Sequence, residues 1–230
     1  MEKEFYKKQT NLVCELIEES RQFNYPSEVL VMLMKGNYIE GLDKNYAGKQ
    51  VIDIGCGLGN NIVFLSSLEL NVFGTEISEE IVNNTKSIVK AKGAKCDLRV
   101  GTNTQIPFED NMFDYLISWN VIHYENSEDD MAQALNEYHR ILKPGGRFFL
   151  QTGTPEHFIW KDSVRIDVHL RLIGKSDDYR KGKILYYFGT EEYLRKFLSK
   201  KFNDILIGRY TNDLFTKKFD LFVATGVKGK

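Results

Sequence analysis

Short apolar runs alternate along the chain with segments whose apolar residues recur at helical spacing. The runs, each of the length and composition of a buried strand, cover residues 51–54, 71–75, 96–100, 113–118 and 147–152. Helical periodicity follows the first two runs and returns over about 128–142, before the fifth run. Strands that alternate with helices predict an α/β fold with a mostly parallel sheet covered on both faces.

The C-terminal part predicts one more helix and two more strands. The helix begins at Thr190, and the strands lie near 205–209 and 219–225. The polar segment 210–218 between them is too short for a crossover helix, so the two strands should form a hairpin. The segment before the helix, 153–189, is irregular in pattern and rich in charged and aromatic residues.

The length of 230 residues suits one domain with a sizeable core. We predict a single domain over 1–230 with four parts. They are an N-terminal helical extension (1–47, with helices near 4–21 and 27–36), a ligand-binding core (48–152), a lid-like insertion (153–189), and a C-terminal helix with a strand pair (190–230).

Charge and cysteine content narrow the classes of partner. Lys and Arg total 31 and Asp and Glu total 32, so the net charge of −1 gives no bulk attraction to nucleic acid or an anionic membrane. No apolar run approaches the ~20 residues of a membrane-spanning helix, and the first residues lack the apolar core of a signal peptide. The three cysteines are odd in number and widely spaced, which suits reduced thiols, and no Cys/His cluster has zinc-site spacing. We expect a cytoplasmic protein without metal, membrane insertion or nucleic-acid partner, and the oligomeric state stays open.

A glycine-rich loop follows the first strand directly. It reads Gly55-x-Gly57-x-Gly59 and opens a helix. Glycine permits positive φ and a close approach of ligand to backbone, although such a loop can also serve only to pack a helix on a strand. Glu76 ends the second strand, where an acidic side chain can accept hydrogen bonds from both hydroxyls of a ribose. A solvated glutamate at a strand end is the alternative for Glu76. The glycine loop and Glu76 together favour a nucleotide cofactor.

The position of the third glycine separates two cofactor classes. The dinucleotide fingerprint G-x-G-x-x-G would place it at residue 60, which is Asn60 here. The loop therefore departs from the pattern of NAD-binding proteins, and an NAD-dependent oxidoreductase is the less favoured alternative.

Four segments together resemble the motifs of class I S-adenosylmethionine (SAM)-dependent methyltransferases. They cover residues 51–60, 72–78, 106–114 and 142–147, and their order is similar to that of the ubiquinone/menaquinone methyltransferase subgroup. The resemblance extends over about 48–152. It implies a Rossmann-like seven-stranded sheet, mostly parallel, with the last strand antiparallel. It also implies that SAM is the cofactor and that a methyl group passes to an O, N or C nucleophile of a small-molecule acceptor. A non-catalytic SAM-binding regulatory protein is the alternative.

The resemblance also assigns residues to the cofactor. Gly55 and Gly57 would cradle the methionine part, and Asp53 would orient the loop or the amino group. Glu76 would hold the ribose, and Ile77 would pack on the adenine. The family often has an aspartate after the third strand, where this chain has Thr102 followed by Asn103, so either could bond to adenine. The cofactor residues implied are Asp53, Gly55, Cys56, Gly57, Gly59, Asn60, Glu76, Ile77, Thr102, Asn103, Trp119 and Asn120.

One histidine is a candidate general base. His123 follows the fourth strand, close to the expected methyl group, although it could equally be a structural histidine that caps the loop. The segment 153–189 is longer than an ordinary strand–helix connection, so we expect it to form a lid over the acceptor together with the N-terminal helices. An oligomer contact or a surface helix far from the chemistry is the alternative. The acceptor would then meet Tyr124, Trp160, Arg165, His169 and Tyr187.

Overall fold

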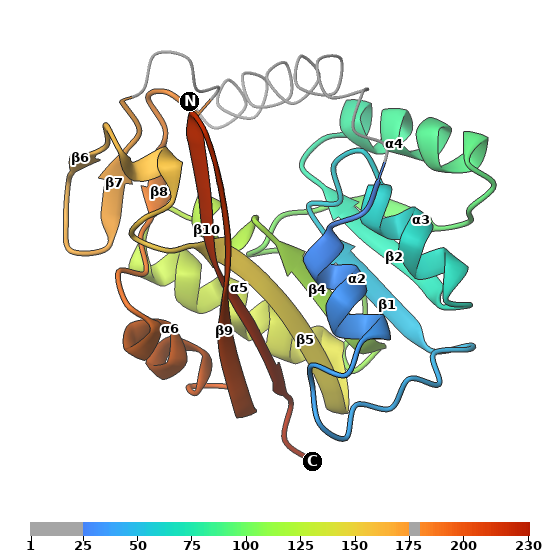
Figure 1. Ribbon diagram of the computed structural model, residues 1–230. Coiled ribbons are helices and arrows are strands. Elements are labelled where there is room, and N and C mark those ends of the chain that lie inside the picture. The colour runs from blue at the N-terminus through green and yellow to red at the C-terminus, as the bar shows by residue number, and fades with distance from the viewer. Residues whose placement is uncertain (1–24, 175–179) are drawn as a thin grey trace.

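The computed structural model describes residues 25–174 and 180–230, so the expected helix near 4–21 lies outside the described part. A seven-stranded sheet with the order β3-β2-β1-β4-β5-β10-β9 forms the centre of the molecule (Figure 1). Its first five strands are mutually parallel, whereas β10 runs antiparallel to both β5 and β9. The predicted mostly parallel sheet with an antiparallel last strand is confirmed.

The central strands of the sheet coincide with apolar runs of the sequence. All but the first residue of β1 are buried, and β4 and β5 are largely buried. Their bounds are β1 Gln50–Ile54, β2 Asn71–Glu76, β3 Asp97–Val100, β4 Phe113–Trp119, β5 Leu142–Gly153, β9 Asn203–Leu214 and β10 Lys217–Val227.

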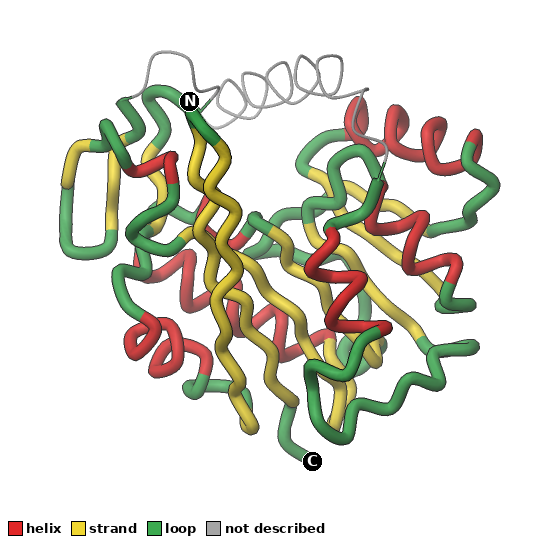
Figure 2. Tube along the Cα trace, viewed as in Figure 1, coloured by secondary structure: helices red, strands yellow, loops and turns green. Residues whose placement is uncertain are grey.

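Helices cover both faces of the sheet, with the strands between them (Figure 2). On one face an apolar core joins the sheet to α2 (Glu28–Lys35), α3 (Asn60–Ser67) and α4 (Glu79–Ala91). On the other face a second core joins it to α5 (Glu128–Ile141) and α6 (Glu191–Leu198). Cap residues fix where three of these helices begin, because the side chains of Ser78, Ser127 and Thr190 each accept a hydrogen bond from a backbone N–H of the first turn.

Two boundaries differ from the sequence prediction. The polar segment 210–218 is not a loop, because β9 and β10 continue through it and Leu214 pairs with Lys217. β9 is an exposed edge strand, so polar residues occur along it without marking its end. β5 also begins five residues early, directly after α5, and a register shift against β4 absorbs the extra residues.

The insertion is more regular than predicted. It contains a short 3₁₀ helix, η2 (Phe158–Trp160), and a small antiparallel sheet of β6 (Val164–Arg165), β7 (Leu170–Leu172) and β8 (Ile184–Tyr186). Within this segment η2 contacts the hairpin, since the rings of Phe158 and of Phe219 on β10 meet at 4.9 Å. Strands of two or three residues are too short to give a recognisable period, which is why the sequence did not reveal them.

Candidate functional site

The three loop glycines follow β1 and all adopt positive φ: 62° at Gly55, 53° at Gly57 and 73° at Gly59. Their surroundings differ. A Cβ on Gly59 would lie 2.4 Å from a methyl carbon of Val89, so this glycine lets α3 pack against α4. A Cβ on Gly57 would meet no atom within 4 Å, so the backbone there faces open space. The loop therefore combines a packing glycine with one that leaves room for a ligand.

Gly59→Ala is expected to destabilise the protein by about 2–4 kcal/mol. The cost of placing alanine in the left-handed backbone conformation adds to the cost of overpacking its methyl group against Val89. Gly93→Ala is the matched control: its φ is 75°, but a Cβ there meets nothing within 4 Å, so about 1–2 kcal/mol is expected. Urea denaturation measures both. Equal losses of stability in the two variants would show that the Val89 side chain moves aside without a cost in free energy.

Two buried carboxyl groups lie beside this loop. Glu76, the last residue of β2, accepts hydrogen bonds from the backbone N–H of Gly57 at 2.7 Å and from that of Ile77 at 3.1 Å. Asp53, on the adjacent strand β1, is 1% exposed, and its Oδ2 has no hydrogen-bond partner among the described residues. Burial, reinforced by the nearby Glu76, raises the pKa of Asp53 to about 8. Burial also raises the pKa of Glu76, and the two backbone bonds oppose that rise. The site therefore concentrates potential negative charge beside an open stretch of backbone.

Two other loop residues are turned toward the protein. The thiol of Cys56 is buried near Gly74, and burial raises its pKa. The side-chain oxygen of Asn60 accepts a hydrogen bond from Lys92 Nζ on the segment after α4.

The residues expected near adenine also have partners in the protein. The Asn103 amide donates to Glu125 and to the carbonyl of Val121, and its oxygen accepts a 2.5 Å bond from the buried Tyr138 hydroxyl. Asn103 thus ties the loop after β3 to α5 and to the segment after β4. Thr102 is half-buried and bonds to Thr104, and Ile77 is half-buried at the end of β2.

The chain turns sharply after β4. Asn120 adopts a φ of 59°, and its amide donates to the Gln151 side chain on β5. Trp119, the last residue of β4, packs against the core on the α2–α4 face. Val121 follows and would lie 2.7 Å from a Cβ on Gly55, so this turn closes against the glycine loop.

His123 lies in the 3₁₀ helix η1 (Ile122–Tyr124) and is 2% exposed. Its Nδ1 lies 3.2 Å from the Thr152 hydroxyl, its ring stacks on Tyr124 at 5.0 Å, and its Nε2 has no partner among the described residues. Burial, with Arg180 and His157 nearby, lowers its pKa to about 3, so the ring is neutral at pH 7.

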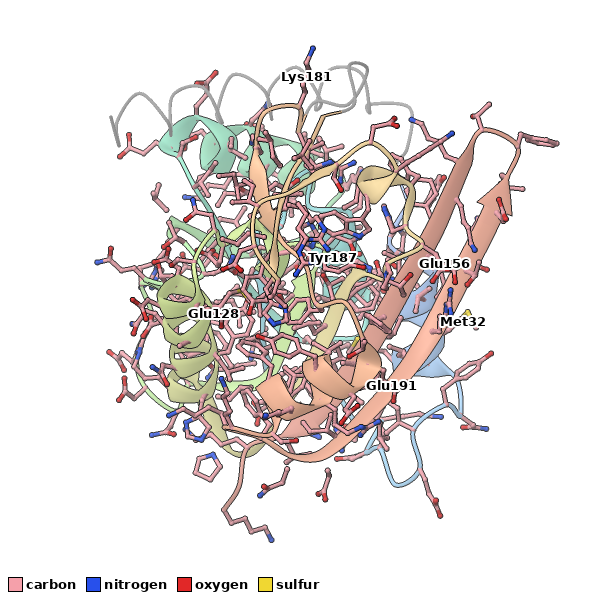
Figure 3. The ribbon with its side chains drawn as sticks, turned by 90° about the vertical axis from the view of Figure 1, so that its left-hand side faces the viewer. Met32, Glu128, Glu156, Lys181, Tyr187 and Glu191 are labelled. Atoms are coloured by element: carbon pink, nitrogen blue, oxygen red, sulfur yellow. The ribbon has the colours of Figure 1, made fainter. Side chains whose placement is uncertain are left out.

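The candidate acceptor residues separate into two groups. Tyr124, Trp160 and Tyr187 share one apolar cluster, in which the Trp160 and Tyr187 rings meet edge to face at 5.2 Å. His169 instead stacks on Tyr193 of α6 at 3.8 Å, and Arg165 lies exposed on β6. Tyr187 is half-buried, and its label lies near the middle of the view in Figure 3.

The structure adds Lys183, which sequence reasoning missed. Its Nζ lies 5.6 Å from the centre of the Tyr124 ring. Residues 183 and 124 are brought together by the packing of β8 against η1, and a lysine in a charged segment carries no signal of that contact.

Two further features concern the described residues alone. In the ranges 25–174 and 180–230, none of the helices combines the length and apolar character needed to cross a membrane. The same ranges hold no group of three His, Cys, Asp or Glu side chains placed to share a metal ion.

Comparison with known proteins gives matches over the central segment. Residues 51–146 match a family described as a methyltransferase domain. The demethylmenaquinone methyltransferase of Geobacillus kaustophilus is 33% identical over 117 residues, covering 48% of this chain and 48% of that protein. The probable tRNA methyltransferase 9B of Bos taurus is 30% identical over 109 residues, covering 47% of this chain and 22% of that protein. The matches thus span about half or less of these relatives.

The fold comparison extends further along the chain. The crystal structure of a SAM-dependent methyltransferase from Methanosarcina mazei covers 89% of this chain and 99% of its own, with a TM-score of 0.69 and 18% sequence identity. At that identity the likeness concerns the fold alone, and this fold is the Rossmann-like, mostly parallel seven-stranded sheet expected from the motifs.

Proposed function

We propose that this chain, which contains a methyltransferase domain of the class I type, transfers a methyl group from SAM to a nucleophilic atom of a small-molecule acceptor. The observation that carries the proposal is the pair of buried acids, Asp53 and Glu76, beside the open backbone of Gly57. All three lie at or just beyond the carboxyl ends of β1 and β2, where parallel sheets bind ligands.

The residues fit SAM part by part. The unpartnered Asp53 Oδ2 suits the ammonium of the methionine part, because a buried carboxylate gains most from a cation. Each Glu76 carboxylate oxygen accepts one backbone bond and keeps a further acceptor position, so the two oxygens can also accept from two ribose hydroxyls. Gly57 leaves room for the chain between them. When bound, SAM supplies a methyl carbon attached to a positively charged sulfur.

The protein's own contribution is chiefly positioning. Trp119 ends β4, the strand next to β1, and Asn120 follows it, so both would line the cofactor pocket. Holding the acceptor in line with the methyl group accounts for a large part of catalysis. A general base works best with a pKa near the working pH. Since the pKa of His123 is about 3, we propose that it orients the acceptor as a neutral ring rather than removing a proton.

Two alternatives are separated by direct measurement. Calorimetric titration with SAM and with NAD distinguishes the proposed cofactor from a dinucleotide, and binding of NAD alone would sink the proposal. Formation of S-adenosylhomocysteine with a panel of small acceptors and with tRNA tests turnover. One relative is named a tRNA methyltransferase, but the net charge of −1 favours the small molecule. Cofactor binding without turnover on any acceptor would indicate a regulatory protein.

SAM binding is expected to release a proton from Asp53. With a pKa of about 8 the free carboxyl is mostly protonated at pH 7, whereas the ammonium of SAM favours the carboxylate. Affinity should therefore rise as pH increases from 6 to about 8 and fall again above 8, where the α-amino group of SAM, with an ordinary pKa of about 8, loses its proton. Titrations across this range, in buffers of different ionisation enthalpy, measure the effect, and Asp53→Asn should remove it. A dissociation constant that is independent of pH would contradict it.

A further inference from the structure

Two buried nitrogen atoms near the end of β5 have no hydrogen-bond partner among the described residues: His123 Nε2 and Trp160 Nε1. Their residues are only 2% and 8% exposed. An indole N–H can only donate, so Trp160 can be satisfied only by an acceptor atom such as oxygen. Buried polar groups in native proteins are nearly always paired, so an orphaned pair requires an explanation.

Both atoms belong to one part of the fold. His123 contacts Thr152 through its other nitrogen, and the next residue, Gly153, approaches Trp160 so closely that a Cβ there would lie 3.2 Å from the indole nitrogen. Tyr124, stacked on the His123 ring, shares an apolar cluster with Trp160. This places the two side chains around the end of β5, next to the turn that follows β4.

The charge beside them is positive. The Lys183 ammonium lies over the Tyr124 ring, and burial and the nearby Arg180 lower the pKa of this lysine. The charge of Arg180 also helps to lower the pKa of His123. Lys183 makes no ion pair with a carboxylate of the described residues. A half-buried cation of this kind beside an unpaired N–H donor favours a negatively charged oxygen over a neutral one.

We propose that Trp160, His123 and Lys183 form the acceptor subsite and that it takes a small molecule with an anionic oxygen, a carboxylate or a phenolate. The inference rests on the proposed function, since it names the acceptor class of that site. In it the Trp160 indole N–H donates to the charged oxygen, the neutral His123 ring supplies a second hydrogen bond, and Lys183 balances the charge.

The test uses a matched pair of probes that differ in charge, 2-naphthoate and 2-naphthamide, added to the full chain with S-adenosylhomocysteine. The chain has 2 tryptophans, so the indole ¹H–¹⁵N spectrum holds two signals, and Trp160→Phe assigns them. We expect 2-naphthoate to shift the Trp160 signal with little effect on Trp119, and 2-naphthamide to bind at least tenfold more weakly.

Lys183→Met should weaken 2-naphthoate about tenfold, whereas Lys181→Met, an exposed lysine that projects from the edge of the molecule (Figure 3), should not. Equal affinity for the two probes, or no shift of Trp160 by either, would overturn the inference. Calorimetry on the same sample keeps the two proposals apart: absence of S-adenosylhomocysteine binding contradicts the proposed function, whereas its binding without an anion effect contradicts only the acceptor class.

Discussion

Glu76→Ala is expected to weaken SAM binding about 100-fold while the protein stays folded. Hydrogen bonds to a charged group contribute about 1.5–3 kcal/mol each, and a loss of about 3 kcal/mol corresponds to two orders of magnitude in affinity. In the structure both carboxylate oxygens of Glu76 are held in place by backbone N–H groups, so the ribose meets an ordered acceptor. Calorimetric titration gives the dissociation constant, and circular dichroism verifies the fold.

Matched variants show whether charge or shape matters at this position. Glu76→Gln keeps one acceptor oxygen and loses the charge, so an intermediate loss of roughly tenfold is expected. Glu79→Ala removes an exposed acid from the first turn of α4, three residues away, and should leave affinity unchanged. Wild-type affinity in folded Glu76→Ala would remove this residue from the site and with it the main support for the proposed function.

The core of the fold could be predicted because its strands are buried on both faces. Such strands read as continuous apolar runs, as 51–54 does, and the helices between them carry cap residues such as Ser78. The hairpin strands were found but shortened, since β9 lies at the edge of the sheet and its exposed residues are polar. The small sheet of the insertion escaped prediction because its strands have two or three residues.

The site shows the same division between local and distant information. The sequence placed Glu76 and the glycine loop at neighbouring strand ends, and the structure brings them into hydrogen-bond contact. It could not show that Asn103 is tied to Tyr138, 35 residues away, or that Lys183 reaches Tyr124. The position of His123 after the fourth strand was evident from the sequence. Its protonation state depends on burial, which lowers its pKa to about 3, and no sequence pattern reveals that.

The segment 106–110, just before β4, is recognisable in the sequence, and the structure supplies a physical reason for it. Arg140 on α5 donates to the carbonyls of Ile106 at 2.9 Å and Phe108 at 2.8 Å, and also pairs with Asp110. Glu137, one helical turn earlier, pairs with Arg140 and accepts a 2.8 Å bond from the Ile106 N–H. The pair fixes a loop that has no secondary structure of its own.

Arg140→Met is therefore expected to lower the free energy of unfolding by about 2–3 kcal/mol at pH 7, because two loop carbonyls and the Glu137 carboxylate lose a charged donor. Arg165→Met, the same change at an exposed position of β6, should cost less than about 0.5 kcal/mol. Urea denaturation measures both. Equal losses would show that the network contributes nothing beyond a surface arginine.

The same network predicts how this loss depends on pH. The hydrogen bond from Arg140 holds the pKa of Glu137 below its ordinary value of 4.5, so its stabilisation is fully present above 4.5 and is lost as pH falls through the lowered value. The difference between wild type and Arg140→Met should accordingly shrink between pH 5 and pH 3. In a double-mutant cycle with Glu137→Gln, a coupling energy of about 1–2 kcal/mol at pH 7 is expected. A coupling near zero, or a difference that stays constant down to pH 3, would mean that Arg140 acts on the loop carbonyls alone and that Glu137 holds Ile106 independently.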